Sequence, residues 1–133
     1  MNLIVVLDDR DGMTFNHRRQ SRDRNLTARI LERCDGRLIV HPFSADLFAG
    51  SNAALTVTET PLADAGPGEW CFAETGSLAP AKERIERLIV YRWNRVYPAD
   101  QKFDLSLSEL KLTSKTDFAG YSHPTLTEEV YEP

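Results

Sequence analysis

Cysteine and long apolar runs are both scarce in this chain. Its 133 residues include two cysteines, Cys34 and Cys71, which form no CxxC pair. Such sparse usage favours a reduced protein without a disulfide framework, so we expect a cytoplasmic location. No stretch approaches the roughly 20 apolar residues that a membrane-spanning helix needs, and the N-terminal apolar run is too short for a signal peptide. We therefore expect no membrane partner.

Metal-binding and nucleophile motifs are also lacking. The three histidines, His17, His41 and His123, lie far apart, and the chain has no nucleophile elbow and no phosphate-binding loop. A binuclear metal site needs more ligands than these histidines supply, so we expect no metal. Neither Asp nor Cys lies close to His123 in the sequence, which gives no indication of a nucleophilic triad.

Lysine and arginine are absent from residues 41–79, and the chain as a whole carries a net charge of −4. This balance argues against bulk attraction to nucleic acid, and we expect no such partner. Seven arginines and no lysine fall between Arg18 and Arg37. The arginine fork suits a planar carboxylate or phosphate. Alternatively, these arginines pair with the acidic residues interleaved with them, which are Asp8, Asp9, Asp11, Asp23, Glu32 and Asp35.

The chain does contain a regular order of apolar segments. Leu3–Leu7 is an unbroken, largely β-branched run, which predicts a strand buried on both faces at the centre of a sheet. The other predicted elements are a helix from about Arg22 to Cys34 capped by Ser21, a strand Arg37–His41, a short helix Ala45–Ala49 capped by Ser44, strands Leu55–Thr58 and Glu69–Ala73, a helix from Ser77 to about Arg87, a strand Leu88–Arg95, and late strands Leu110–Ser114 and Thr125–Tyr131. We predict one domain, 1–133, of the α/β class, with a mostly parallel central sheet, helices on both faces and a C-terminal antiparallel hairpin.

Polar residues gather where the predicted strands end. The loop from Asp8 to Arg19 leaves the carboxyl end of the first strand, where α/β proteins place ligands. His41 ends another buried strand, and an imidazole there could act as a base. Asp8 and His41 are therefore the candidate catalytic residues. The candidate ligand-binding residues are Asp9, Arg10, Asn16, Arg18, Arg19, His41 and Glu74.

Several phrases resemble the dihydrofolate reductases. LIVVLDDRDGM is similar to their first strand and following loop, RNLTARILERCDGRLIV to their first helix and second strand, and LIVYRWNRVYPADQKFDL to a later strand and turn. The resemblance implies a shortened dihydrofolate-reductase-like fold and raises NADPH as a cofactor. With the sheet order that it implies, His41 is expected to face the same crevice as Asp8 and Glu74. The chain is also similar to a group of short bacterial proteins that share the phrases FNHRRQSRDR and WNRxYPAD.

The departures from the reductases fall on their contact residues. Asn25 stands where they use a carboxylate to hold the pterin, although Asp23 lies two residues earlier. Residues 41–44 replace their phosphate-binding Gly-Arg-Thr phrase, and Glu74-Thr75-Gly76 replaces their paired glycines. A carboxylate there would repel the phosphates of a dinucleotide. NADPH remains a possible cofactor whose usual contacts are not matched.

Three functional hypotheses follow. The first is binding of an anionic or nucleotide-like small molecule in a reductase-like crevice. The second is an enzyme, either a divergent NADPH-dependent reductase or a small hydrolase that uses Asp8 or His41. The third is a protein interaction module without a small ligand, in which the arginine-rich helix edge meets an acidic surface such as residues 41–79 and could produce a homo-oligomer.

Overall fold

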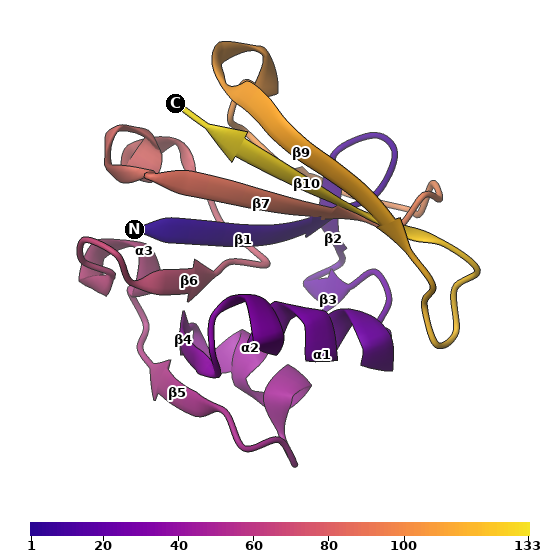
Figure 1. Cartoon of the computed structure of the whole chain (residues 1–133), viewed down its shortest axis with the longest axis horizontal. Helices are drawn as coiled ribbons and strands as arrows, with labels where there is room; N and C mark the ends of the chain where they lie inside the picture. The colour runs from indigo at the N-terminus through magenta and orange to yellow at the C-terminus, as the bar shows by residue number, and fades with distance from the viewer.

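A seven-stranded mixed sheet organises the chain, described by a computed structural model covering residues 1–133. Its strand order is β5-β4-β6-β1-β7-β10-β9 (Figure 1). The strands are β1 (Asn2–Leu7), β4 (Arg37–Val40), β5 (Ala54–Val57), β6 (Trp70–Phe72), β7 (Arg87–Arg92), β9 (Lys111–Phe118) and β10 (Leu126–Glu132). The first five in this order run parallel, and β10 is antiparallel to both β7 and β9. The predicted α/β fold with a C-terminal antiparallel hairpin is confirmed.

Strand β1 occupies the centre of the sheet, as its composition predicted. Leu3 pairs with Cys71 of β6 on one side and with Leu88 of β7 on the other. Leu3, Ile4 and Val5 are all fully buried. A strand enclosed on both faces and along both edges needs apolar side chains at successive positions, which explains the unbroken run.

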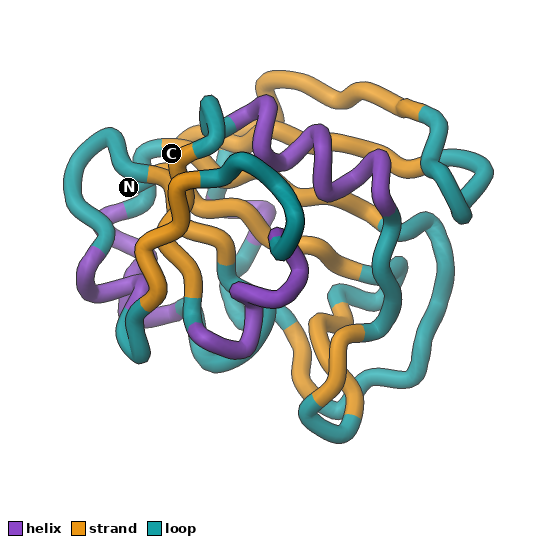
Figure 2. The backbone as a smooth tube through the Cα atoms, turned by 90° about the horizontal axis from the view of Figure 1, so that it is seen from below, coloured by secondary structure: helices purple, strands orange, loops and turns teal.

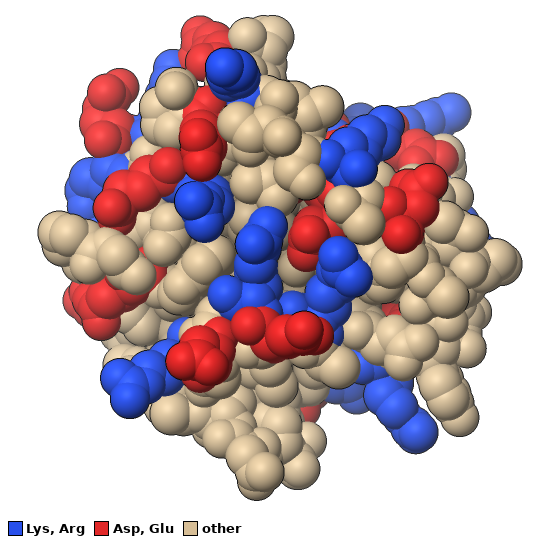
Figure 3. Space-filling model, viewed as in Figure 1, with Lys and Arg blue, Asp and Glu red and all other residues tan.

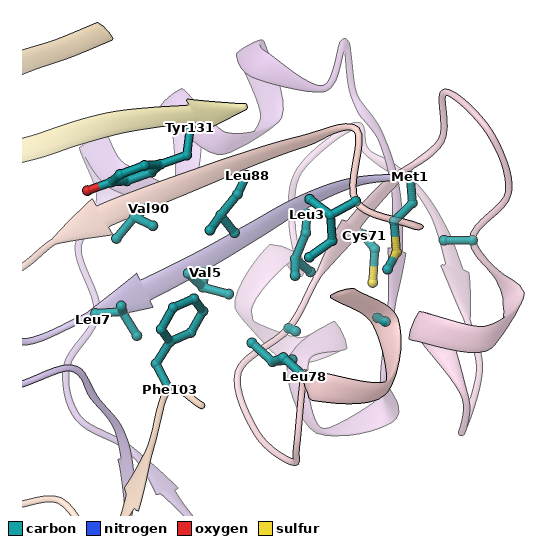
Figure 4. Packing of buried hydrophobic residues seen from close by; sticks show 14 of the residues in the cluster. Met1, Leu3, Val5, Leu7, Cys71, Leu78, Leu88, Val90, Phe103 and Tyr131 are labelled. Atoms are coloured by element: carbon teal, nitrogen blue, oxygen red, sulfur yellow. The ribbon is translucent and has the colours of Figure 1, made fainter. Parts of the chain in front are cut away.

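Each face of the sheet carries its own apolar core. On one face, Leu3, Val5 and Leu88 pack against Leu78 and Phe103 (Figure 4). The segments that cover this face include α3 (Pro61–Asp64), the 3₁₀ helix η2 (Ala79–Arg84) and the 3₁₀ helix η3 (Leu107–Glu109). The other face is covered by α1 (Arg24–Arg33), α2 (Pro42–Ala45) and the 3₁₀ helix η1 (Asp46–Phe48), and Figure 2 shows α1 lying across the strands. The alternation of side chains along each strand separates the two cores.

The prediction of a loop over residues 8–19 is wrong in part, because residues 12–19 form a hairpin that belongs to a small second sheet. Strands β2 (Gly12–Phe15), β3 (Arg18–Arg19) and β8 (Gln101–Lys102) pair in the order β3-β2-β8. Asn16 and His17 connect β2 to β3 with φ of 52° and 59°. Two successive positive φ angles are typical of the tight turn that matches strand twist in a hairpin.

Two predicted helix caps and one predicted helix also need correction. Asp23, and not Ser21, caps α1, because its carboxylate accepts the N–H groups of Asn25 and Leu26. Ser44 lies inside α2, whose cap is His41. The segment after Ser77 forms only a 3₁₀ helix, which ends where Ile85 becomes extended and packs into the core. None of the helices has the length and apolar character that a bilayer crossing requires.

Candidate functional site

A cleft of about 470 Å³ opens at the carboxyl ends of the parallel strands β4, β5 and β6. We call it the strand-end cleft. It is lined by residues 59–63, 72–77 and 80–81, together with His41 and Arg84. The carboxyl ends of parallel strands are where α/β folds bind ligands, because the connecting segments diverge there and leave a hollow.

The ionisable side chains inside the strand-end cleft already have partners. His41 accepts the Phe43 N–H at Nδ1 over 3.0 Å, and its Nε2 lies 3.1 Å from a carboxylate oxygen of Glu59. The Arg84 guanidinium donates to two backbone carbonyl oxygens, those of residues 62 and 65. His41 therefore both caps α2 and faces the cleft, and Arg84 braces the cleft wall.

Arg19 of β3 forms a bidentate ion pair with Glu74, which follows β6 and lines this cleft. Both Nε and a terminal nitrogen of Arg19 donate to the two carboxylate oxygens, the second over 2.7 Å. The two side chains are only 17% and 7% exposed. The hydrogen bonds that Arg19 donates to Glu74 raise the pKa of Arg19 above its ordinary value. The guanidinium also lies 5.4 Å from the centre of the Phe43 ring. The pair ties the small sheet to the large one.

A second, smaller cavity lies between α1 and the sheet. We call it the α1 cavity; its volume of about 20 Å³ leaves room for roughly one water molecule. Its walls include Arg19, Ser21 and Trp93, and it shares Phe72 and Glu74 with the strand-end cleft. The Arg19–Glu74 pair thus lies where the two hollows meet.

Asp8 does not face the strand-end cleft, contrary to the sequence expectation that it would share a crevice with His41 and Glu74. One carboxylate oxygen accepts the N–H groups of Arg10 and Gly12, each over 2.8 Å, and the other accepts the Tyr97 N–H and the Gln20 amide. Burial raises the pKa of Asp8, but these hydrogen bonds outweigh it and hold the pKa below its ordinary value. Asp8 therefore shapes the β1–β2 turn.

The remaining candidate residues lie around the small sheet. Asp9 and Arg10 are exposed in the turn after β1, and Arg10 lines a hollow beside Tyr97. Asn16 and Arg18 line another hollow, which Arg19 borders. Among the proposed ligand-binding residues, Arg19 and Glu74 are in direct contact. His41 lines the same cleft as Glu74.

The arginine-rich segment pairs with distant acidic residues, and not with those interleaved in it. Arg19 and Arg22 both approach Asp46, and Arg29 and Arg33 both approach Glu128. On the face shown in Figure 3, basic and acidic side chains are interspersed instead of gathered by sign. Helix α1 thus uses its arginines to bind the elements that pack around it.

A buried polar cluster that the sequence did not reveal lies beside the α1 cavity. His123 Nδ1 is 2.9 Å from Asp23 Oδ2, and His123 Nε2 is 3.1 Å from Ser21 Oγ and 3.2 Å from the Tyr97 hydroxyl. The Trp93 ring lies 4.7 Å from the imidazole, centre to centre. Ser21 and Asp23 precede α1, whereas His123 precedes β10. Only tertiary docking joins them, and no local motif could have shown it.

The cluster also determines the charge of Asp23. Burial raises the pKa of Asp23, but the N–H groups of Tyr121 and Ser122, the His123 ring and the Leu26 N–H more than compensate and hold it well below the ordinary carboxyl value. The carboxylate is therefore ionised at neutral pH, and it favours the imidazole tautomer with hydrogen on Nδ1.

Neither a metal ion nor NADPH matches the side chains present. No three His, Cys, Asp or Glu side chains come together in an arrangement that could hold a metal. The phosphates of a dinucleotide in the strand-end cleft would face Glu59 and Glu74, while Arg84 is engaged by backbone carbonyls. The cleft therefore does not fit NADPH bound as in a reductase.

Comparison with known proteins supports the fold. No protein-family model matches the chain, and no curated protein sequence matches it. Among solved structures, it is similar to dihydrofolate reductase from Enterococcus faecalis complexed with NADP(H) and RAB-propyl. The TM-score is 0.67 at 13% sequence identity, covering 98% of this chain and 94% of that one. The chain therefore has a dihydrofolate-reductase-like fold.

Proposed function

We propose that this protein binds an anionic, nucleotide-like small molecule, with the anion held by Arg19 and the rest of the molecule in the strand-end cleft. The observation that carries the proposal is the pairing of Arg19 with Glu74. It shows a largely buried arginine fork, at the edge of the cleft, already holding a carboxylate in the bidentate geometry. A carboxylate or phosphate of a ligand would satisfy the same two donors.

Glu74 then acts as an internal competitor for the anion site. A ligand anion must displace the Glu74 carboxylate, which would remain nearby on the wall of the cleft. The ligand anion and the Glu74 carboxylate carry like charges and repel each other unless a hydrogen-bond donor lies between them. The preferred ligand therefore carries an amino or amide donor close to its anionic group, so that Glu74 accepts a hydrogen bond from it.

The apolar part of the cleft suits a flat ring. Phe72, Ala73, Pro80 and Ala81 all contribute to the lining, and the volume of about 470 Å³ lies within the range of small-molecule sites. His41 also lines the cleft, with its two ring nitrogens beside the Phe43 N–H and the Glu59 carboxylate. These features support a heterocyclic ligand more than an extended chain.

Calorimetry tests the proposal by comparing the native protein with Glu74→Gln and Arg19→Gln. The ligand panel contains AMP, GMP, folate, NADPH and inorganic phosphate. Glu74→Gln removes the competing charge and should tighten anion binding about tenfold or more, since one charge-assisted hydrogen bond contributes about 1.5–3 kcal/mol. Arg19→Gln should weaken it by a similar factor.

Arg37→Gln is the matched control, because Arg37 is exposed at the opposite end of β4 from the cleft. It should leave binding unchanged. The proposal fails if no member of the panel binds either the native protein or Glu74→Gln. It also fails if Arg19→Gln and Arg37→Gln have the same affinity as the native protein.

A further inference from the structure

We propose that Ser21, His123 and Asp23 form a nucleophilic site that cleaves small carboxylic esters at the edge of the α1 cavity. The hydrogen bonds run in the order serine hydroxyl, imidazole Nε2, imidazole Nδ1, carboxylate, over 3.1 Å and 2.9 Å. That order is the one in which a serine hydroxyl is activated, and it is recognised by geometry whatever the order of the residues along the chain. The site does not depend on anion binding at Arg19.

The surroundings hold the imidazole in the orientation that this chemistry needs. Asp23 is completely buried and His123 is 5% exposed, so the ring cannot turn away from its partners. Trp93 lies against the ring face. With hydrogen on Nδ1 facing the ionised carboxylate, the lone pair of Nε2 is directed to the Ser21 hydroxyl.

Ser21 is the member of the cluster that a substrate can reach. It is half-buried and lines the α1 cavity, whereas Asp23 and His123 are buried. Each of the two residues that flank Ser21 in the chain has an unpaired polar group. The side-chain oxygen of Gln20 is buried without a hydrogen-bond partner, and the peptide N–H of Arg22 donates to no group of the protein. The Arg22 N–H directly follows the serine in the chain, and it is the candidate donor to a carbonyl oxygen on which negative charge develops.

The reaction is ester hydrolysis in two steps. Ser21 Oγ bonds to the carbonyl carbon while its proton passes to His123 Nε2, which hands that proton to the departing alcohol as the carbon–oxygen ester bond breaks. Water then adds to the acyl-serine and gives its proton to Nε2. The carboxylic acid leaves as the proton returns to Ser21 Oγ. Atoms and charges balance, and no cofactor is required.

Two features limit the substrate. The α1 cavity holds roughly one water molecule, so the acyl group must be small, or the Arg19–Glu74 pair must open. The Tyr97 hydroxyl also contacts Nε2, at 3.2 Å, and shares the acceptor with Ser21. Both features predict that acetyl esters are hydrolysed slowly. Hydrolysis should be faster in a variant without the Arg19–Glu74 pair, because the cavity is then more open.

The experiment treats the full chain with a small fluorophosphonate and measures 4-nitrophenyl acetate hydrolysis in parallel. Attack by Ser21 Oγ on phosphorus expels fluoride and leaves a covalent adduct, which peptide mapping locates. Native protein and Glu74→Gln are both tested, because the Arg19–Glu74 pair could keep the reagent from reaching Ser21 in the native protein. We expect an adduct on Ser21. Ser21→Ala should abolish it and lower ester turnover by about three orders of magnitude.

Ser51→Ala is the control, because Ser51 lies on a loop remote from the cluster and its hydroxyl bonds only to local backbone. It should keep both the adduct and the turnover. If circular dichroism shows that Ser21→Ala is unfolded, Ser21→Gly replaces it and should lose both the adduct and the ester turnover. The inference is overturned if neither native protein nor Glu74→Gln forms an adduct on Ser21, or if turnover survives in a folded Ser21 variant. The Ser21 adduct is scored in native protein and Glu74→Gln, whereas anion binding at Arg19 is scored by calorimetry, so the two proposals fail separately.

Discussion

Replacing Asp23 by asparagine should destabilise the folded protein by about 3 kcal/mol at pH 7, because it removes a buried charge that several donors surround. The carboxylate accepts the N–H groups of residues 25, 26, 121 and 122 and pairs with the His123 ring. Asparagine fits the same space and keeps one acceptor oxygen. Its amide NH₂ would face N–H groups that then lose their partner, and each charge-assisted bond contributes about 1.5–3 kcal/mol.

The pH dependence of the free energy of unfolding shows whether Asp23→Asn destabilises the protein through the lost charge or through altered packing. The pKa of Asp23 is lowered in the folded protein, so its stabilising contribution is complete above the ordinary carboxyl value and is lost as pH falls through the folded value. An unfolded aspartate titrates near about 3.9, so about 1 kcal/mol of the difference between native protein and Asp23→Asn should disappear by pH 3.

Urea unfolding followed by tryptophan fluorescence at pH 7 and pH 3 measures both quantities. Asp9→Asn is the control, because Asp9 is exposed and its side chain makes no hydrogen bond within the protein. It should change the free energy of unfolding by less than about 0.5 kcal/mol. The reasoning is refuted if Asp23→Asn costs less than about 1 kcal/mol at pH 7, or if its cost is equal at the two pH values.

Other consequences of the buried structure can be measured directly. Leu88→Ala, at a fully buried position beside β1, should lower the free energy of unfolding by about 2–5 kcal/mol in urea, and a smaller loss would contradict the observed packing. Tyr91 donates to Glu128 in the interior and its pKa is raised, first by burial, so Tyr91→Phe should cost about 1–3 kcal/mol and remove one late-ionising phenol from an absorbance titration. Cys34 and Cys71 are buried and unpaired, and burial raises the pKa of Cys71 to about 12; neither thiol should react with Ellman's reagent until the protein is unfolded, and rapid labelling of native protein would contradict this.

The strands of the large sheet were predictable because each carries its own signal. The apolar run of β1 predicted the centre of the sheet, and the late strands predicted an antiparallel hairpin, which β9 and β10 form. These features depend on residues close together in the sequence. Periodicity and composition report such neighbours directly.

The small sheet escaped prediction for the same reason. Strand β2 is four residues long, and its turn uses Asn16 and His17 instead of the Asn-Gly pair that signals a hairpin. Its other partner, β8, lies more than eighty residues later in the chain. Gly12 shows how close the approach is: a Cβ there would lie 2.6 Å from Cβ of Ala99.

The cap of α1 illustrates a choice that local sequence leaves open. Ser21 and Asp23 are both good N-cap residues. Residues 121–123 decide between them by presenting N–H groups and an imidazole to Asp23, which draws the carboxylate to the helix start and leaves the serine hydroxyl facing His123.

The sequence by itself determined the α/β class, the central position of β1 and the richness in arginine near the first helix. Only the tertiary structure decided what these side chains meet. Arg19 pairs with Glu74 across 55 residues, and Ser21 reaches His123 across 102. Side chains within one helix turn or strand pair are constrained by local geometry, but partners this distant are selected by how whole elements dock. The Arg19–Glu74 pair and the Ser21–His123 contact of the candidate sites belong to that second kind.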